Sequence, residues 1–246
     1  LLRYRSAIEL GEHSPMVIRR TVQLLQSRGR FDEAQDLLRR LASHLTPDVE
    51  LARLSLSSMV GRESPEQLVA KAMKLAPVDS KEYRDHLWLG HLLHSLGDRA
   101  KEAEAAYRRA TELGPEAGDA WVGLVSFLAA TKQAAKAETA AADAAKKLKG
   151  ANMVIPLAAC FEAAGQFPQA ERTLTGALAA NANDPVLRRQ LAGLYLRTGE
   201  VAKAEPILVP LASGSSESAG WARRHRAMLL LRTGSYAQIR DALPLD

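Results

Sequence analysis

The feature that most constrains this chain is a small or polar residue that recurs every 32 to 36 positions. At each recurrence an apolar pattern typical of one helix stops and the pattern of a second helix begins. The residues at these positions are Gly29, Gly61, Gly97, Lys132, Gly165, Gly199 and Gly234. A helical hairpin of this length cannot bury both of its faces alone, so the period predicts an array of stacked hairpins.

Small residues follow the turns in a regular way. An alanine stands five residues after most turns (six after Gly97), and a larger apolar residue usually stands four residues after that alanine. The alanines are Ala34, Ala103, Ala137, Ala170 and Ala204, and their partners are Leu38, Tyr107, Ala141, Leu174 and Leu208. Residues four apart lie on one face of a helix. We therefore expect a neighbouring helix to approach closely at each alanine.

Helix breakers agree with this division. Prolines fall between the predicted hairpins, where a helix must stop, at Pro15, Pro47, Pro77, Pro115 and Pro185. The run from Ser64 to Gln67 predicts a helix start with Ser64 as its cap and Gln67 bonding back to it. The Ser- and Gly-rich segment 213–220 predicts a mobile loop inside the array.

The pattern resembles the tetratricopeptide repeat, a helix–turn–helix unit of 34 residues. The matching residues are Trp121-x2-Leu124, Leu89-Gly90, Ala103-x3-Tyr107, Ala110 and Pro115, and the resemblance covers nearly the whole chain. It implies an all-α, right-handed superhelical solenoid of about seven repeats.

We expect a single array over residues 1–246, in which residues 1–14 form the second helix of a preceding repeat. The expected repeats are 15–46, 47–80, 81–115, 116–150, 151–184, 185–218 and 219–246. The second repeat fits least well, because no register of residues 49–60 matches the first-helix pattern. The last repeat also departs, with Arg226 at a position where a large apolar residue is usual.

The resemblance also implies a concave groove, lined by the first helix of each repeat, that binds a peptide or a helix. The residues that would line it are Arg19, Gln23, Arg84, Trp88, His91, His94, Ser126, Arg189, Arg197 and Arg224. Some members of the family hold a terminal carboxylate with lysines and asparagines. That clamp is absent here, because Gln23, His91 and Ser126 stand where asparagines would be needed.

Charge is the other feature of the sequence that concerns a partner. The chain carries 33 Lys and Arg against 28 Asp and Glu, and the segments 185–198 and 219–240 contain arginines but no acidic residue. These arginines predict either a site for an acidic partner or a solvated basic face, and both readings stay open. Binding of nucleic acid is the weaker expectation, because exposed aromatics do not alternate with the basic residues.

No catalytic pattern is present. The sequence lacks the glycine-rich, Walker, zinc-protease and nucleophile-elbow motifs, so we expect no cofactor and no enzymatic activity. His91 and His94 share a helix face but lack the further ligands that a zinc site needs. We therefore expect a scaffold for protein–protein interaction; the alternative is the regulatory or substrate-recruiting arm of a larger bacterial enzyme, such as a kinase or a glycosyl- or sulfotransferase.

The surroundings of the protein are less constrained. Cys160 is the only cysteine, which fits a reducing compartment such as the cytoplasm, and we expect it to pack as a small apolar residue. No segment approaches the roughly 18 apolar residues of a membrane span. The chain begins with Leu1 and resembles a piece of a longer protein.

Overall fold

The computed structural model describes residues 1–41, 49–214 and 216–233, and its regular structure in these ranges is entirely helical. These described ranges contain fourteen α-helices and a short 3-10 turn at Ala151–Met153. The expectation of an all-α repeat array is confirmed. The chain forms two compact units, Leu1–Gly114 and Pro115–Asp246, and each is described by itself.

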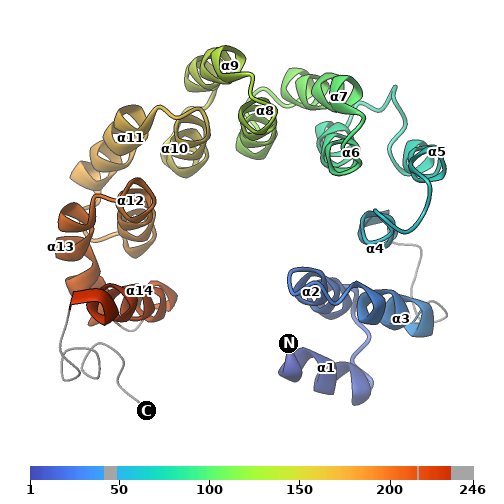
Figure 1. Cartoon of the computed structure of the whole chain (residues 1–246), viewed down its shortest axis with the longest axis horizontal. Coiled ribbons are helices and arrows are strands. Elements are labelled where there is room, and N and C mark those ends of the chain that lie inside the picture. The colour runs from blue at the N-terminus through green and yellow to red at the C-terminus, as the bar shows by residue number, and fades with distance from the viewer. Residues whose placement is uncertain (42–48, 215, 234–246) are drawn as a thin grey trace. The chain divides into compact units, whose positions relative to one another are not determined.

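The first unit holds three helical hairpins and one preceding helix (Figure 1). Its helices are α1 (Leu2–Glu9), α2 (Pro15–Gln26), α3 (Phe31–Leu41), α4 (Val49–Ser57), α5 (Pro65–Leu75), α6 (Tyr83–Ser95) and α7 (Ala100–Leu113). Helix α2 packs against α3, α4 against α5, and α6 against α7. A core cluster that includes Ile18, Val22 and Leu37 joins α2 and α3 and reaches Leu51 of α4.

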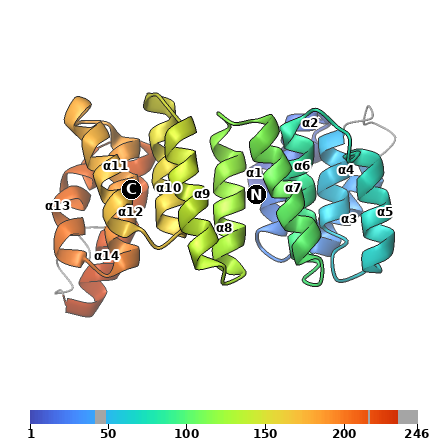
Figure 2. The ribbon, with the colours of Figure 1, turned by 90° about the horizontal axis from the view of Figure 1, so that it is seen from above.

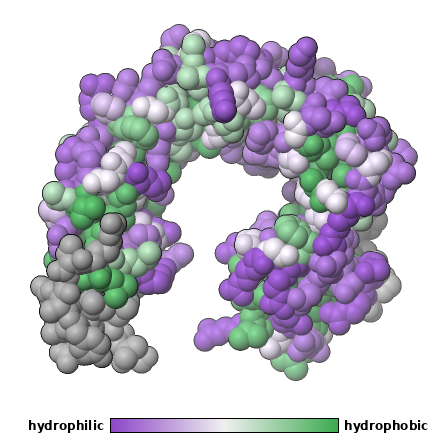
Figure 3. All heavy atoms as spheres, viewed as in Figure 1, coloured by the Kyte–Doolittle hydropathy of each residue, from purple (hydrophilic) through white to green (hydrophobic). Residues whose placement is uncertain are grey.

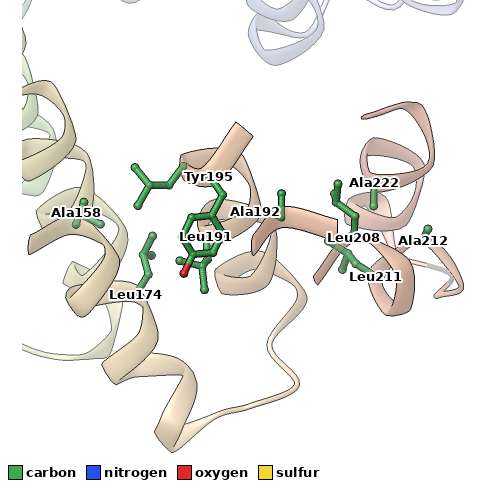
Figure 4. Packing of buried hydrophobic residues seen from close by; sticks show 12 residues of the cluster. Ala158, Leu174, Leu191, Ala192, Tyr195, Leu208, Leu211, Ala212 and Ala222 are labelled. Atoms are coloured by element: carbon green, nitrogen blue, oxygen red, sulfur yellow. The ribbon is translucent and has the colours of Figure 1, made fainter. Parts of the chain in front are cut away.

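The second unit repeats the same arrangement. Its helices are α8 (Gly118–Ala130), α9 (Ala134–Lys147), α10 (Val154–Ala163), α11 (Phe167–Ala180), α12 (Pro185–Thr198), α13 (Val201–Ala212) and α14 (Glu217–Thr233). Neighbouring helices lie side by side along this unit (Figure 2). Leu174 of α11 lies beside Leu191 and Tyr195 of α12, and Leu208 of α13 lies beside Ala222 of α14 (Figure 4). The core is thus continuous from one hairpin to the next.

The six described turn positions share one backbone conformation. Gly29, Gly61, Gly97, Gly165 and Gly199 have positive φ, and so does Lys132, with φ of 60°. After Lys132, the amide of Gln133 donates to the carbonyl of Leu128 at 2.8 Å, which closes the end of α8. Gly recurs at these turns because a left-handed residue ends a helix at little steric cost only when it lacks a Cβ. Gly234, the seventh predicted turn, lies outside the described residues.

The predicted alanines are buried in every hairpin where they occur. The relative exposure of Ala34, Ala103, Ala137, Ala170 and Ala204 is 0 or 1%. The family-like residues also meet: a Cβ on Gly90 would lie 2.9 Å from the Tyr107 ring, so this glycine permits the close packing of α6 on α7. Trp121 donates its indole N–H to the carbonyl of Pro115 at 2.8 Å, which ties α8 to the preceding loop.

The helix ends confirm one sequence prediction in part and correct another. Ser64 caps α5, and its hydroxyl accepts from the amide of Gln67 at 3.3 Å. The return bond expected from the Gln67 side chain is not formed with any described residue.

The loop expected at 213–220 is wrong in its second half, because Glu217–Gly220 form the first turn of α14. Acidic Glu217 stabilises that helix start, which the serine content of the segment concealed.

Polar side chains cover most of the visible surface of both units (Figure 3). Among the described residues, no helix is both long enough and apolar enough to span a membrane. The expected repeat boundaries stay a prediction, and the parts that fall on 42–48 and 234–246, including Arg240, lie outside the described residues.

Candidate functional site

Three successive first helices of the first unit line a pocket of about 440 Å³. We call it the arginine pocket, and its lining residues are Arg19 of α2, Glu50 and Arg53 of α4, and Arg84, Leu87, Trp88 and His91 of α6. Four of these, Arg19, Arg84, Trp88 and His91, are residues that the sequence placed in the groove. The structure therefore brings together residues that are up to 72 positions apart in the sequence.

Arg53 forms the buried part of this pocket. Only 6% of its side chain is exposed, and its guanidinium donates to Glu50 at 3.1 Å, to the Leu75 carbonyl at 2.8 Å and to Asp85 at 2.5 Å. The same guanidinium lies over the ring of Trp88, 5.1 Å from its centre. A buried charge is tolerated only when it is paired and hydrogen-bonded, so Arg53 holds α4 against both α5 and α6.

Asp85 completes this network from the start of α6. Its carboxylate accepts from Arg53 and, at 2.6 Å, from the hydroxyl of Ser80. Burial raises the pKa of Asp85, but the hydrogen bonds from Ser80 and Arg53 outweigh burial and hold the pKa below its ordinary value. The carbonyl of Ser80 contacts the ring Nε2 of His86 at 3.0 Å. The loop before α6 is therefore fixed by polar contacts as well as by packing.

His91 is held in place from the neighbouring helix of its own hairpin. The hydroxyl of Tyr107 and the His91 Nδ1 are 2.9 Å apart, and the two rings meet edge to face. Burial raises the pKa of Tyr107, so its hydroxyl stays protonated. The imidazole consequently has a fixed orientation at the edge of the arginine pocket.

The other residues predicted for the groove lie on first helices but outside this pocket. Gln23 on α2, His94 on α6 and Ser126 on α8 are exposed, and so is Arg224 on α14. Among the described residues, no group of three or more His, Cys, Asp or Glu side chains could hold a metal ion. These four positions therefore offer a surface for contact and not a preformed cavity.

The arginines near the end of the second unit make contacts within the protein. Arg197 forms a two-pronged ion pair with Glu162 of α10, with one N–O distance of 2.8 Å. Arg189 lies 5.4 Å from the ring centre of Trp221, and Arg223 donates to the Ala212 carbonyl at 2.9 Å. Both α12 and α14 thus use arginine for their own packing, and the preference of this end for an acidic partner stays a prediction. The side chains of Arg232 and Arg240 lie outside the described residues.

Arg53 and Glu50 were not predicted as site residues. The first-helix pattern fits no register of residues 49–60, where α4 buries Arg53 among its leucines. The available signal was a single arginine among Leu51, Leu54 and Leu56, since a charge on an apolar helix face needs a partner.

Cys160 behaves as the sequence indicated. Its side chain on α10 is fully buried, and burial raises the pKa of the thiol to about 12. A neutral, inaccessible thiol is a poor nucleophile, so Cys160 packs as a small apolar residue.

Comparison with known proteins supports the repeat assignment. Two family models of the tetratricopeptide repeat match the chain, one over residues 86–152 and the other over residues 161–222. No curated protein shows significant similarity to the chain.

Several solved structures are similar to this chain at low sequence identity. A tetratricopeptide repeat protein from Parabacteroides merdae is 14% identical, with a TM-score of 0.52 over 92% of this chain and 89% of that one. A thermophilic repeat protein from Thermus thermophilus is 18% identical, with a TM-score of 0.47 over 74% of this chain and all of that one. The pilF protein of Pseudomonas aeruginosa is 16% identical, with a TM-score of 0.46 over 79% and 90%. At such identity the likeness to the first of these shows the fold alone.

Proposed function

Because the chain belongs to the tetratricopeptide repeat family, we propose that it is a non-catalytic scaffold that holds a peptide or a helix of a partner protein against its first helices. Repeats of this family generally mediate protein–protein interactions. The observation that carries the proposal is the arginine pocket, because α2, α4 and α6 together present a hollow with charged and aromatic walls. Such a hollow suits a side chain better than a flat helical surface does.

The second helices offer a contrasting surface. Several of their charged residues pair with neighbours on the same helix, as Arg108 does with Glu104 and Arg109 with Glu112 on α7. Pairs of this kind keep a helix face solvated and leave little for a partner to recognise. The first helices are therefore the favoured binding face.

Site-directed photocrosslinking in the source cells tests this proposal. A photoreactive amino acid replaces Gln23 on α2 or Ser126 on α8, both exposed on first helices. Matched controls replace Lys74 on α5 or Glu138 on α9, which are exposed on second helices. We expect one partner protein to be captured from the first-helix positions and not from the controls.

Equal capture from all four positions, or capture from the second helices alone, would contradict the proposal. A substrate-recruiting arm of a larger enzyme would use the same face. The identity of the captured protein therefore distinguishes that role from a purely scaffolding one.

A further inference from the structure

We infer that the arginine pocket receives an acidic side chain of the partner protein, with an apolar neighbour of that side chain packed on Trp88. This inference rests on the proposed function, since it assumes that the first-helix face binds a protein. It adds that the arginine pocket is the part of that face which contacts the partner, and that the pocket recognises a carboxylate beside an apolar group.

The lining of the pocket carries more positive than negative charge. Three arginines line the pocket, whereas Glu50 is the only carboxylate among the lining residues. Glu50 and Asp85 both pair with Arg53, so the charge at the floor of the pocket is already matched. Arg19 has no carboxylate within ion-pair distance among the described residues, and its one hydrogen bond there, to the Pro15 carbonyl, is long at 3.4 Å. A carboxylate entering beside Arg19 would therefore meet a guanidinium that has strong donors to offer.

The floor of the pocket also favours a ligand that accepts hydrogen bonds. The Nε of Arg53 is buried and has no hydrogen-bond acceptor among the described residues. An unmatched buried donor is costly, so an acceptor that the partner brought within reach of this Nε would stabilise the complex.

Shape and apolar surface narrow the ligand further. Trp88 is half-buried beside buried Leu87, and Arg53 covers its ring from one side. The volume of about 440 Å³ accommodates more than a lone carboxylate group. An acidic side chain followed by an apolar one would fill both the charged and the apolar parts of this pocket.

The same walls favour a peptide over a nucleic acid. Single-stranded nucleic acid binds on successive aromatic platforms in a continuous basic groove. This pocket has a single indole among its lining residues, so it offers one such platform and not a row of them. A peptide with one apolar side chain beside its acidic residue needs only that single platform.

The test uses the full chain and an array of short synthetic peptides of random sequence, probed at low salt. The pocket variant carries Arg19→Glu and Arg84→Glu, which reverse two charges and leave Arg53, Glu50 and Asp85 unchanged. The matched control carries Arg108→Glu and Arg109→Glu on α7, an equal change of net charge in the same unit. Circular dichroism and thermal unfolding establish that both variants fold.

We expect retained peptides to be enriched in Asp or Glu next to an apolar residue. Their dissociation constants should rise about tenfold or more in the pocket variant and change little in the control. A single-stranded oligonucleotide serves as the competing probe, and tighter binding of that probe at the same pocket would overturn the inference.

The outcomes separate the two proposals. Peptides could bind and crosslink at the Gln23 or Ser126 position without enrichment in acidic residues, or with dissociation constants that do not change in the pocket variant. Either result would refute the inference and leave the proposed function standing. If no peptide binds and no partner crosslinks to the first helices, the proposed function fails as well.

Discussion

Arg53 donates to Asp85 at 2.5 Å across the gap between α4 and α6, two helices from successive hairpins. The pair also involves the carbonyl of Leu75 at the end of α5, so one guanidinium joins three helices. In the second unit, by contrast, Leu174 of α11 and Leu191 of α12 join successive hairpins through apolar side chains (Figure 4). A polar contact in this place makes the middle of the first unit depend on charge.

Replacing Arg53 by Met should destabilise the protein by about 3 kcal/mol, because it leaves a buried carboxylate without its cation. The control is Arg108→Met on α7, which breaks a partly exposed ion pair and should cost less than about 1 kcal/mol. Urea unfolding followed by circular dichroism measures both. A loss below about 1 kcal/mol for the Arg53 variant would show that the pair does not hold α4 in place.

Acid should remove the contribution of Asp85. Its pKa is lower in the folded protein than in the unfolded chain, so its stabilising effect is present above the unfolded pKa of about 3.9 and is lost as pH falls through the folded pKa. We expect the difference in unfolding free energy between the parent and Asp85→Asn to be largest near neutral pH and to shrink below about pH 4. A difference that is constant over this range would contradict the assignment.

Replacing Lys132 by glycine should stabilise the protein. It is the one described non-glycine residue with positive φ, a conformation that costs about 1–2 kcal/mol for a residue with a Cβ. After the extra entropy of an unfolded glycine is subtracted, Lys132→Gly should raise the unfolding free energy by about 0.5–1 kcal/mol. Glu138→Gly, at an exposed position inside α9, should instead lower it by about 1 kcal/mol. Thermal unfolding of the two variants gives the comparison, and a lower melting temperature for Lys132→Gly would refute it.

Much of the fold could be predicted from the sequence because its determinants are local. The turn glycines and the alanines after them follow from helix geometry within one hairpin, as Gly165 and Ala170 illustrate. Spacing alone identifies which residues share a face, and it required no knowledge of the neighbouring hairpin.

The arginine pocket could be predicted only in part because its determinants lie in different hairpins. Arg19, Arg84, Trp88 and His91 follow from their positions on first helices, whereas Arg53 breaks the apolar pattern that defines such a helix. Its acceptor, Asp85, lies 32 positions later and comes into reach only when α4 packs on α6. The internal contacts of the arginines on α12 and α14 could not be predicted either. Their acceptors include backbone carbonyls such as that of Ala212, and residue types do not reveal such acceptors.

Gly90 should not tolerate a methyl group. A Cβ there would lie 2.9–3.0 Å from the ring of Tyr107, which is fully buried and cannot move aside. Gly90→Ala should therefore cost about 1–3 kcal/mol by overpacking. Gly176→Ala is the matched control, because no atom lies within 4 Å of its Cβ position on α11. That change should stabilise the protein by about 0.5–1 kcal/mol, and the same sign of effect for both variants would contradict the packing argument.

Ala137 provides the strictest test of close helix approach. It is fully buried on α9, whereas Ala135 is exposed on the same helix two residues earlier. Ala137→Phe adds a ring where the neighbouring helix leaves no space, so it should cost about 1–3 kcal/mol or more, and Ala170→Phe on α11 should behave in the same way. Ala135→Phe changes the same residue type and should cost only its small difference in helix propensity, about 0.5 kcal/mol.

Because stability in a repeat array is shared mainly between neighbours, hydrogen exchange in the Ala137→Phe variant should show the loss of protection at α8, α9 and α10 first. Uniform loss of protection along the second unit would mean that its hairpins unfold as one body and not repeat by repeat.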